Sequence, residues 1–109
     1  MKHYRVRMIH DAETDLKEIF TYIRQRDSLQ RATEVMDALQ SGCATLAQFP
    51  GRGHVPRELA QIDALHYREV VHGPWRVIYQ IDGNDVLIHA MLDGRRDVQN
   101  LLSHRLTRP

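Results

Sequence analysis

Four arginines lie in or directly after the strand-like stretches in the last part of the chain, where they could hold an anion. Arg68 lies in "HYREVV" and Arg76 in "WRVIYQID", whereas Arg95 and Arg96 lie in "DGRRD", Asp93 to Asp97. A guanidinium group binds phosphate or carboxylate through two parallel hydrogen bonds and stays charged at all ordinary pH values. The cluster therefore indicates either a phosphate site, of the kind that holds an RNA backbone, or a contact with acidic groups.

Acids of the same chain are also possible partners for these arginines. If their strands pair in antiparallel fashion, Arg68 and Arg76 could face each other across the ladder, which is unfavourable unless an anion lies between them. That anion could be a phosphate, a partner's carboxylate, or an internal acid such as Glu69 or Asp93. Internal ion pairing with Asp93 and Asp97 is the simpler alternative, because surface ion pairs are common and contribute little.

Other kinds of reaction centre find little support. The seven histidines and the single cysteine, Cys43, have no metal-ligand spacing, so no metal site is expected. Neither a G-x-S-x-G motif nor a glycine-rich phosphate loop is present, so we expect no covalent catalysis and no cofactor. Cys43 lies in an apolar pattern and is expected in the core. His54 lies on a loop, where it is either a surface residue or an acid or base, and His89 is expected to be partly buried.

Length and composition indicate one globular domain over residues 1–109. Hydrophobic residues make up 42% and charged residues 27% of the chain, which argues against disorder. The formal net charge of +1 gives no strong overall field that would attract nucleic acid. Because there is neither a signal peptide nor a long apolar run, we expect a cytoplasmic protein without a membrane partner.

The first half of the chain predicts one strand and two helices. Tyr4–Ile9 alternates in polarity and predicts a strand. Apolar residues at helical spacing then predict two amphipathic helices, interrupted at Arg26–Ser28, the second ending at Pro50. We expect Asp11 to cap the first helix. Four acids near the start of that helix suit its dipole and need no catalytic explanation, namely Asp11, Glu13, Asp15 and Glu18.

The second half predicts a three-strand meander and a final helix. The strands are expected at His66–Val71, Trp75–Asp82 and Asp85–Leu92, with Gly83-Asn84 as a two-residue hairpin turn. Val98–Leu106 predicts a short C-terminal helix. The fold class is therefore α+β, with a small antiparallel sheet (the N-terminal strand plus the meander) covered by the helical hairpin. In the middle strand, one face carries Trp75, Val77, Tyr79 and Ile81, and the other carries Arg76, Ile78 and Gln80.

Five stretches of this sequence, in this order, resemble the RelE/ParE superfamily of toxins from bacterial type II toxin–antitoxin modules. They are "DLKEIFTYI", "FPGRGHVPREL", "YREVV", "WRVIYQID" and "DGRRD". The resemblance covers nearly the whole chain and implies the same fold, a small sheet under a helical hairpin. It also implies a toxin that inhibits growth, with a role in plasmid stabilisation. A cognate antitoxin would hold it inactive, and operator DNA would be reached only through that antitoxin.

The superfamily has two branches with different mechanisms. RelE-like members cleave mRNA in the ribosomal A site. They use basic side chains on the scissile phosphate and, in many members, a tyrosine or histidine near the C-terminus. ParE-like members are described as inhibitors of DNA gyrase without established catalytic residues. By this resemblance Arg76 and Arg96 match two RelE arginines, and Arg68 stands where RelE has a lysine. Val70 replaces the next lysine, and Leu102 replaces the tyrosine.

These replacements favour the ParE-like branch, with gyrase inhibition by binding. RNA cleavage needs a base and an acid, and each contributes about 10²–10⁴-fold in rate, but leucine can be neither. The alternative is a ribosome-dependent mRNA endonuclease in which Arg68, Arg76 and Arg96 hold the phosphate and His54 or His66 is the base. A third possibility is a degenerate member that binds only its antitoxin and operator.

We expect the antitoxin to bind an apolar groove rimmed by basic residues. Its contacts would come from the helical hairpin and the exposed sheet edge.

Overall fold

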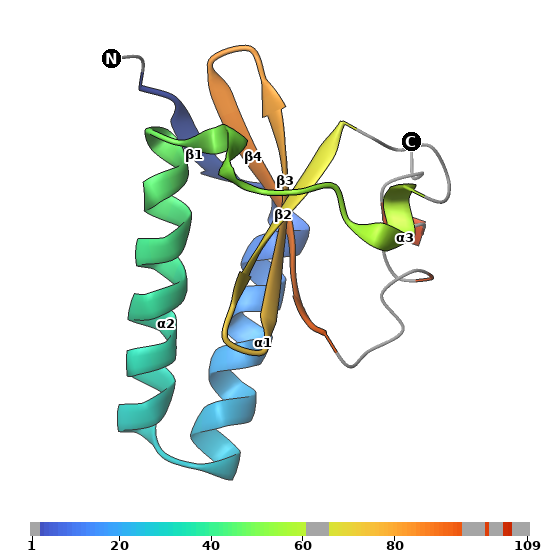
Figure 1. The fold of residues 1–109 in the computed structure, drawn as a ribbon. Coiled ribbons are helices and arrows are strands. Elements are labelled where there is room, and N and C mark those ends of the chain that lie inside the picture. The colour runs from blue at the N-terminus through green and yellow to red at the C-terminus, as the bar shows by residue number, and fades with distance from the viewer. Residues whose placement is uncertain (1–2, 61–65, 95–99, 101–103, 106–109) are drawn as a thin grey trace.

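The computed structural model describes residues 3–60, 66–94, 100, 104 and 105 of the chain. A helical hairpin lies against one face of a four-stranded sheet, and a short helix lies on the opposite side (Figure 1). The helices are α1 (His10–Arg26), α2 (Leu29–Ala44) and α3 (Arg57–Ala60), with 3-10 turns at Thr45–Ala47 and Pro50–Arg52. The strands are β1 (Arg5–Met8), β2 (Tyr67–His72), β3 (Trp75–Asp82) and β4 (Asp85–Asp93).

The sheet is mixed, with the strand order β1-β4-β3-β2. β2, β3 and β4 form the expected antiparallel meander, and Gly83 adopts a φ of 60° in the turn between the last two strands. β1 lies at an edge as expected, but it runs parallel to β4, in register from Arg5↔Asp85 to Met8↔Ile88. The expectation of a purely antiparallel sheet was therefore wrong. Two long helices separate β1 from the meander, so neither direction was imposed by a short turn.

The helical hairpin has different ends from those expected. α1 begins at His10 after Ile9, so Asp11 lies in the first turn rather than at the cap. Ser28 caps α2, because its side chain accepts a hydrogen bond from the backbone N–H of Arg31 at 3.0 Å. α2 ends at Ala44 rather than at Pro50, and Phe49, the residue before that proline, is 55% exposed.

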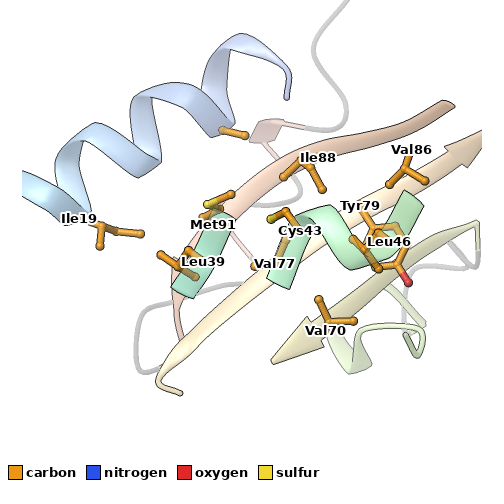
Figure 2. Close-up of a cluster of buried hydrophobic side chains, with 11 residues drawn as sticks. Ile19, Leu39, Cys43, Leu46, Val70, Val77, Tyr79, Val86, Ile88 and Met91 are labelled. Carbon is orange, nitrogen blue, oxygen red and sulfur yellow. The ribbon is translucent and has the colours of Figure 1, made fainter. Parts of the chain in front are cut away.

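The main core lies between the helical hairpin and the sheet. Ile19 of α1 and Leu39 and Cys43 of α2 lie over Val77 and Ile88 of the sheet (Figure 2). Burial raises the pKa of the Cys43 thiol to about 11, so it is a protonated core residue as expected. The apolar face of the middle strand is thus the face that packs against the helices.

A second, smaller cluster covers the other face of the sheet. Leu59 of α3 packs with Ile78, Ala90 and Leu92, all of which are buried. A register shift lies beside it, because Ile78 pairs with Ala90 whereas the next residue of β3 pairs with Ile88. The shift lets β4 present apolar side chains to both layers. His89 lies at this point and is partly buried as expected, and burial, followed by the nearby His66, lowers its pKa.

The predicted C-terminal helix lies largely outside the described residues. Its described members, Asn100, His104 and Arg105, are helical. Among the helices that the structure describes, none has the length and apolar character to cross a membrane.

Candidate functional site

Arg76 lies at the centre of an ion-pair network on the sheet face opposite the helical hairpin. Its Nη1 and Nη2 atoms donate to Oε2 and Oε1 of Glu58, each at 2.7 Å, and its Nε atom donates to Oε2 of Glu69, also at 2.7 Å. The three side chains are 14%, 23% and 6% exposed, respectively. This two-point contact with Glu58 is the strong geometry for an arginine and a carboxylate. All three nitrogens of the guanidinium group therefore bind acids of the chain itself.

The pairing of β2 with β3 brings two of these residues together. Val71 lies opposite Arg76 in the ladder, and Glu69, two residues earlier on β2, lies on the same face and reaches Arg76 diagonally. Glu58 arrives from the other direction on α3, a helix of four residues. The buried side chain of Leu59 holds this helix on the sheet. The network thus ties α3 to two strands.

Arg76 and Glu58 shift each other's pKa values. Hydrogen bonds from Arg76 lower the pKa of Glu58 to about 2, and Glu58 in turn is the main cause that raises the pKa of Arg76. Glu69 adds to this increase through a further hydrogen bond. The guanidinium group and the Glu58 carboxylate are therefore both charged over the whole ordinary pH range.

His54 connects the network to solvent. Its Nε2 atom lies 2.8 Å from Oε1 of Glu69, and its side chain is 65% exposed. Its backbone pairs with that of Glu69 through two hydrogen bonds of 3.0 and 2.6 Å, which form an isolated bridge on the outer edge of β2. A carboxylate that orients an exposed imidazole is the arrangement of a general base.

These groups line a polar cleft of about 420 Å³. The lining residues that the structure describes are His54, Val55, Arg57, Glu58, Glu69, Arg76 and Gly94. Two arginines are matched by two glutamates in this set, so the described lining has no excess positive charge.

Arg68 lies away from this cleft. It pairs with Tyr79 in the ladder and so lies on the face of the helical hairpin, whereas Arg76 lies on the other face. The expectation that Arg68 and Arg76 face each other was wrong, because the register pairs Arg76 with Val71 instead. The guanidinium group of Arg68 donates to the carbonyl oxygen of Gly53 at 2.9 Å, and so it helps to hold the loop before α3.

Tyr79 also holds this loop. Its hydroxyl group donates to the carbonyl oxygen of Pro50 at 2.5 Å and accepts from the backbone N–H of Gly53 at 3.1 Å. Burial is the main cause that raises the pKa of this phenol. The sequence placed Tyr79 on the core face correctly but did not indicate this role for its hydroxyl group.

Asp15 is a second buried acid whose partners the sequence did not indicate. It is 3% exposed, accepts the backbone N–H of Met91 at 2.9 Å, and binds Arg105 through two hydrogen bonds of 2.6 and 2.7 Å. Its assignment to the helix dipole was therefore incomplete. A signal was present, because Asp15 lies at helical spacing between Ala12 and Ile19 on the buried face.

The expectations for the stretch "DGRRD" stay predictions. Arg95, Arg96 and Asp97 lie outside the described residues. Their expected roles in binding an anion or in pairing with each other are therefore not tested by the structure. The partner of Arg76 that the sequence analysis missed is Glu58, which lies in the stretch "FPGRGHVPREL". The position of Arg76 on the same strand face as the apolar Ile78 was the available signal, because a half-buried arginine needs acids nearby.

A groove that could take a partner lies between α1 and the ends of β3 and β4. Its described lining includes three acids, the buried Asp15 and also Glu18 and Asp93. The structure contains no antitoxin, so the expected basic rim of the antitoxin site stays a prediction.

Comparison with known proteins gives the family. A family model described as "ParE toxin of type II toxin-antitoxin system, parDE" matches residues 6–98, which cover all of the elements from α1 to β4 and all but the first residue of β1. This chain belongs to the ParE toxin family. A curated relative, Toxin ParE3 of Caulobacter vibrioides, is 27% identical to this ParE-family chain over 84 residues, which are 77% of this chain and 80% of the relative.

Solved structures share the fold. The "Chromosomal ParDE TA system from P. aeruginosa" matches with a TM-score of 0.69 and 13% identity, over 82% of this ParE-family chain and 94% of the other. The toxin–antitoxin complex RelBE2 from Mycobacterium tuberculosis matches with a TM-score of 0.65 and 20% identity, over 88% and 97%. The RelE/ParE fold inferred from the sequence is confirmed.

Proposed function

We propose that this ParE-family toxin inhibits DNA gyrase by binding it, cleaves no RNA, and is neutralised by a cognate antitoxin. The observation that carries the mechanism is the state of Arg76. An arginine that is to hold a scissile phosphate must present free N–H groups to it. Here Nη1, Nη2 and Nε all donate to Glu58 and Glu69.

A phosphate would have to displace a well-placed carboxylate to reach this arginine. Glu58 offers two oxygens at 2.7 Å in the geometry that a phosphate would use, and its low pKa keeps it anionic. The balanced charge of the cleft adds no attraction for a polyanion. Sequence also counts against RNA cleavage, since Leu102, which replaces the RelE tyrosine by resemblance, cannot transfer a proton. Binding without chemistry is thus the better-supported mechanism.

An antitoxin partner is supported by the proteins that share the fold. The P. aeruginosa match is named as a ParDE toxin–antitoxin system, and the M. tuberculosis match as a toxin–antitoxin complex. We infer that this chain is likewise held by a partner encoded beside it, and that any contact with operator DNA is made by that partner. A cytoplasmic location follows from the same inference.

A supercoiling assay tests the proposal. Purified toxin is added to DNA gyrase and relaxed plasmid, and in parallel to ribosomes carrying mRNA. We expect loss of supercoiling, reversed by the protein of the neighbouring reading frame, and intact mRNA. Cleaved mRNA together with full gyrase activity would overturn the proposal.

RNA cleavage stays the second candidate function, and the position of His54 is the one observation that favours it. This exposed imidazole is oriented by Glu69 and lies in a cleft that also contains Arg57 and Arg76. Under this alternative, His54→Ala lowers mRNA cleavage by about 10²-fold or more, whereas His10→Ala, at an exposed histidine of α1, has no effect. His66→Ala, at the other histidine considered from the sequence, distinguishes which imidazole is the base. If gyrase is the target, His54→Ala leaves inhibition unchanged.

A further inference from the structure

The carboxylate of Glu58 lies where an outside anion would bind Arg76. Its two oxygens lie 2.7 Å from Nη1 and Nη2 of Arg76, one oxygen to each nitrogen. A phosphate group binds a guanidinium group through the same two parallel hydrogen bonds. Arg76 is the main cause of the low pKa of this carboxylate, and the charge of Arg57, the preceding residue, contributes to it. Two arginines thus favour a negative charge at this position.

Glu69 and His54 hold Arg76 in place without using the two nitrogens that bind Glu58. Oε2 of Glu69 accepts a hydrogen bond from Nε of Arg76 at 2.7 Å, and Oε1 lies 2.8 Å from Nε2 of His54. The backbone bridge between His54 and Glu69 fixes this carboxylate further. The guanidinium group is therefore preorganised from the side of Nε. Removal of the Glu58 side chain would leave Nη1 and Nη2 open to the cleft.

Loss of the Glu58 charge would also change the charge balance of the cleft. Its described lining has Arg57 and Arg76 against Glu58 and Glu69, so without Glu58 two arginines would face one glutamate. Arg57 is exposed and forms no ion pair within the described part of the chain. The cleft measures about 420 Å³, whereas a water molecule takes up about 30 Å³ in the liquid. Space and charge would then both suit a phosphate group.

We propose that Glu58 is the residue that closes a phosphate site in this cleft, and that its carboxylate takes the place of the phosphate. Loss of this one side chain opens the site. Nη1 and Nη2 of Arg76 then bind two phosphate oxygens, and Arg57 adds a second positive charge. Glu58 thereby determines that the cleft rejects phosphate in the wild-type chain. The proposal rests on the contacts of the cleft and does not depend on whether gyrase is the target of the toxin.

Equilibrium dialysis of the full-length toxin against labelled inorganic phosphate tests this site. Glu58→Ala removes the carboxylate and leaves a good helix former in α3. We expect this variant to bind phosphate saturably and at least about tenfold more tightly than the wild type. Glu34→Ala removes the same charge at an exposed position of α2 outside the cleft, and is expected to bind phosphate as weakly as the wild type.

A second substitution separates two-point binding by Arg76 from general attraction by charge. In the Glu58→Ala background, Arg76→Lys keeps the positive charge but removes the planar pair of N–H donors. It is expected to weaken phosphate binding by at least about tenfold. Arg31→Lys, at an exposed arginine of α2, is the matched control and should change binding less than about twofold. If Glu58→Ala does not fold, as judged by circular dichroism, the isosteric Glu58→Gln takes its place with a smaller expected gain.

Thermal unfolding provides an independent readout of the same site. Phosphate, compared with chloride at equal ionic strength, is expected to raise the melting temperature of Glu58→Ala but not that of the wild type or of Glu34→Ala. Two trinucleotides, with and without a 5′-phosphate, then compete with labelled phosphate for Glu58→Ala. Competition by both assigns the site to a backbone phosphodiester, and competition by the first alone assigns it to a terminal phosphate.

Several outcomes would overturn the proposal. They are equal phosphate binding by the wild type and Glu58→Ala, equal binding by Glu58→Ala and Glu34→Ala, or equal effects of Arg76→Lys and Arg31→Lys. The supercoiling assay uses the wild-type toxin, in which Glu58 is present. Its failure leaves the phosphate test unaffected, so the two proposals fail separately.

Discussion

The carboxylate of Glu58 competes with any outside anion for the guanidinium group of Arg76. At the scale of single residues, this contact decides what the cleft can do. Arg76 was a candidate for phosphate binding because of its residue type and strand position, but its neighbours give it a structural role. Its anion-binding role stays a prediction, and it now requires that Glu58 first be displaced.

Replacement of Glu58 by glutamine should reveal a pH-dependent contribution to stability. The pKa of Glu58 is about 2 in the folded chain, against an ordinary value of 4.5. A carboxylate with a depressed pKa stabilises the fold above its unfolded pKa, and this contribution is lost as the pH falls. We expect Glu58→Gln to lower the free energy of unfolding by about 2 kcal/mol at pH 7. That difference should shrink between pH 4.5 and 2.

Urea unfolding at a series of pH values measures this difference. Glu34→Gln is the matched control, because this exposed glutamate has only long contacts, a 3.5 Å ion pair with Arg31 and a 3.4 Å hydrogen bond from Gln30, and it should change stability by less than about 0.5 kcal/mol. A constant difference between wild type and Glu58→Gln from pH 7 to pH 3 would show that the ion pair is not its cause.

At the scale of elements, the loop after α2 is held from one face of the sheet and along its edge. Tyr79 and Arg68 bind its backbone from the face of the hairpin, and the backbone bridge of His54 with Glu69 fixes it along the edge of β2. This placement positions α3, and with it Glu58. The loop is therefore the part of the chain that assembles the cleft.

Gly53→Ala should disturb this loop by a steric effect. A Cβ atom at Gly53 would lie 2.5 Å from the hydroxyl oxygen of Tyr79 and 2.6 Å from the carbonyl oxygen of Glu69. Both are held in place, so we expect a loss of about 2 kcal/mol in the free energy of unfolding. Gly51→Ala, where nothing lies within 4 Å, is the control and should stay within about 0.5 kcal/mol of wild type. Equal melting temperatures for the two variants would contradict this account.

The N-terminus of α2 gives a second test at this scale. Ser28→Ala removes the side-chain acceptor of the Arg31 N–H and should cost about 1 kcal/mol of stability. Ser41→Ala, at an exposed position inside the same helix, should be neutral or stabilising by a few tenths of a kcal/mol. Thermal unfolding compares the two. A loss at Ser41 as large as that at Ser28 would mean that the cap is not the cause.

At the scale of the whole molecule, the buried Asp15 connects the two ends of the chain. It joins α1 to the backbone of β4 and to Arg105, ninety positions further along the sequence. A buried carboxylate needs such partners, since an unpaired charge in the interior is strongly destabilising. The ion pair thereby attaches Arg105 to α1.

A double-mutant cycle measures this connection. Arg105→Gln should lower the free energy of unfolding by about 3 kcal/mol because it leaves the Asp15 charge uncompensated. In the Asp15→Asn background the same change should cost much less, giving a coupling of at least about 1.5 kcal/mol. Urea unfolding of all four proteins supplies the values. Additive losses would show that the two side chains act independently.

The sequence by itself determined the local elements. Apolar spacing of 3.6 and 2 residues gave the two long helices and the three-strand meander, and turn residues such as Gly83 gave the hairpin. The alternation along β3 also gave the correct core face. The order of the five motifs indicated the superfamily, because it follows the order of the helices and strands in the fold. These features depend on neighbours in the chain, and so they can be read from it.

Only the tertiary structure decided which side chains meet. The parallel direction of β1, the register that separates Arg68 from Arg76, and the arrival of Glu58 over the sheet all depend on contacts between distant segments. A charged side chain has the same sequence signal whether water, a phosphate or an internal acid neutralises it. Burial and geometry choose among these partners, and they assign Arg76 to Glu58 and Glu69, and Asp15 to Arg105.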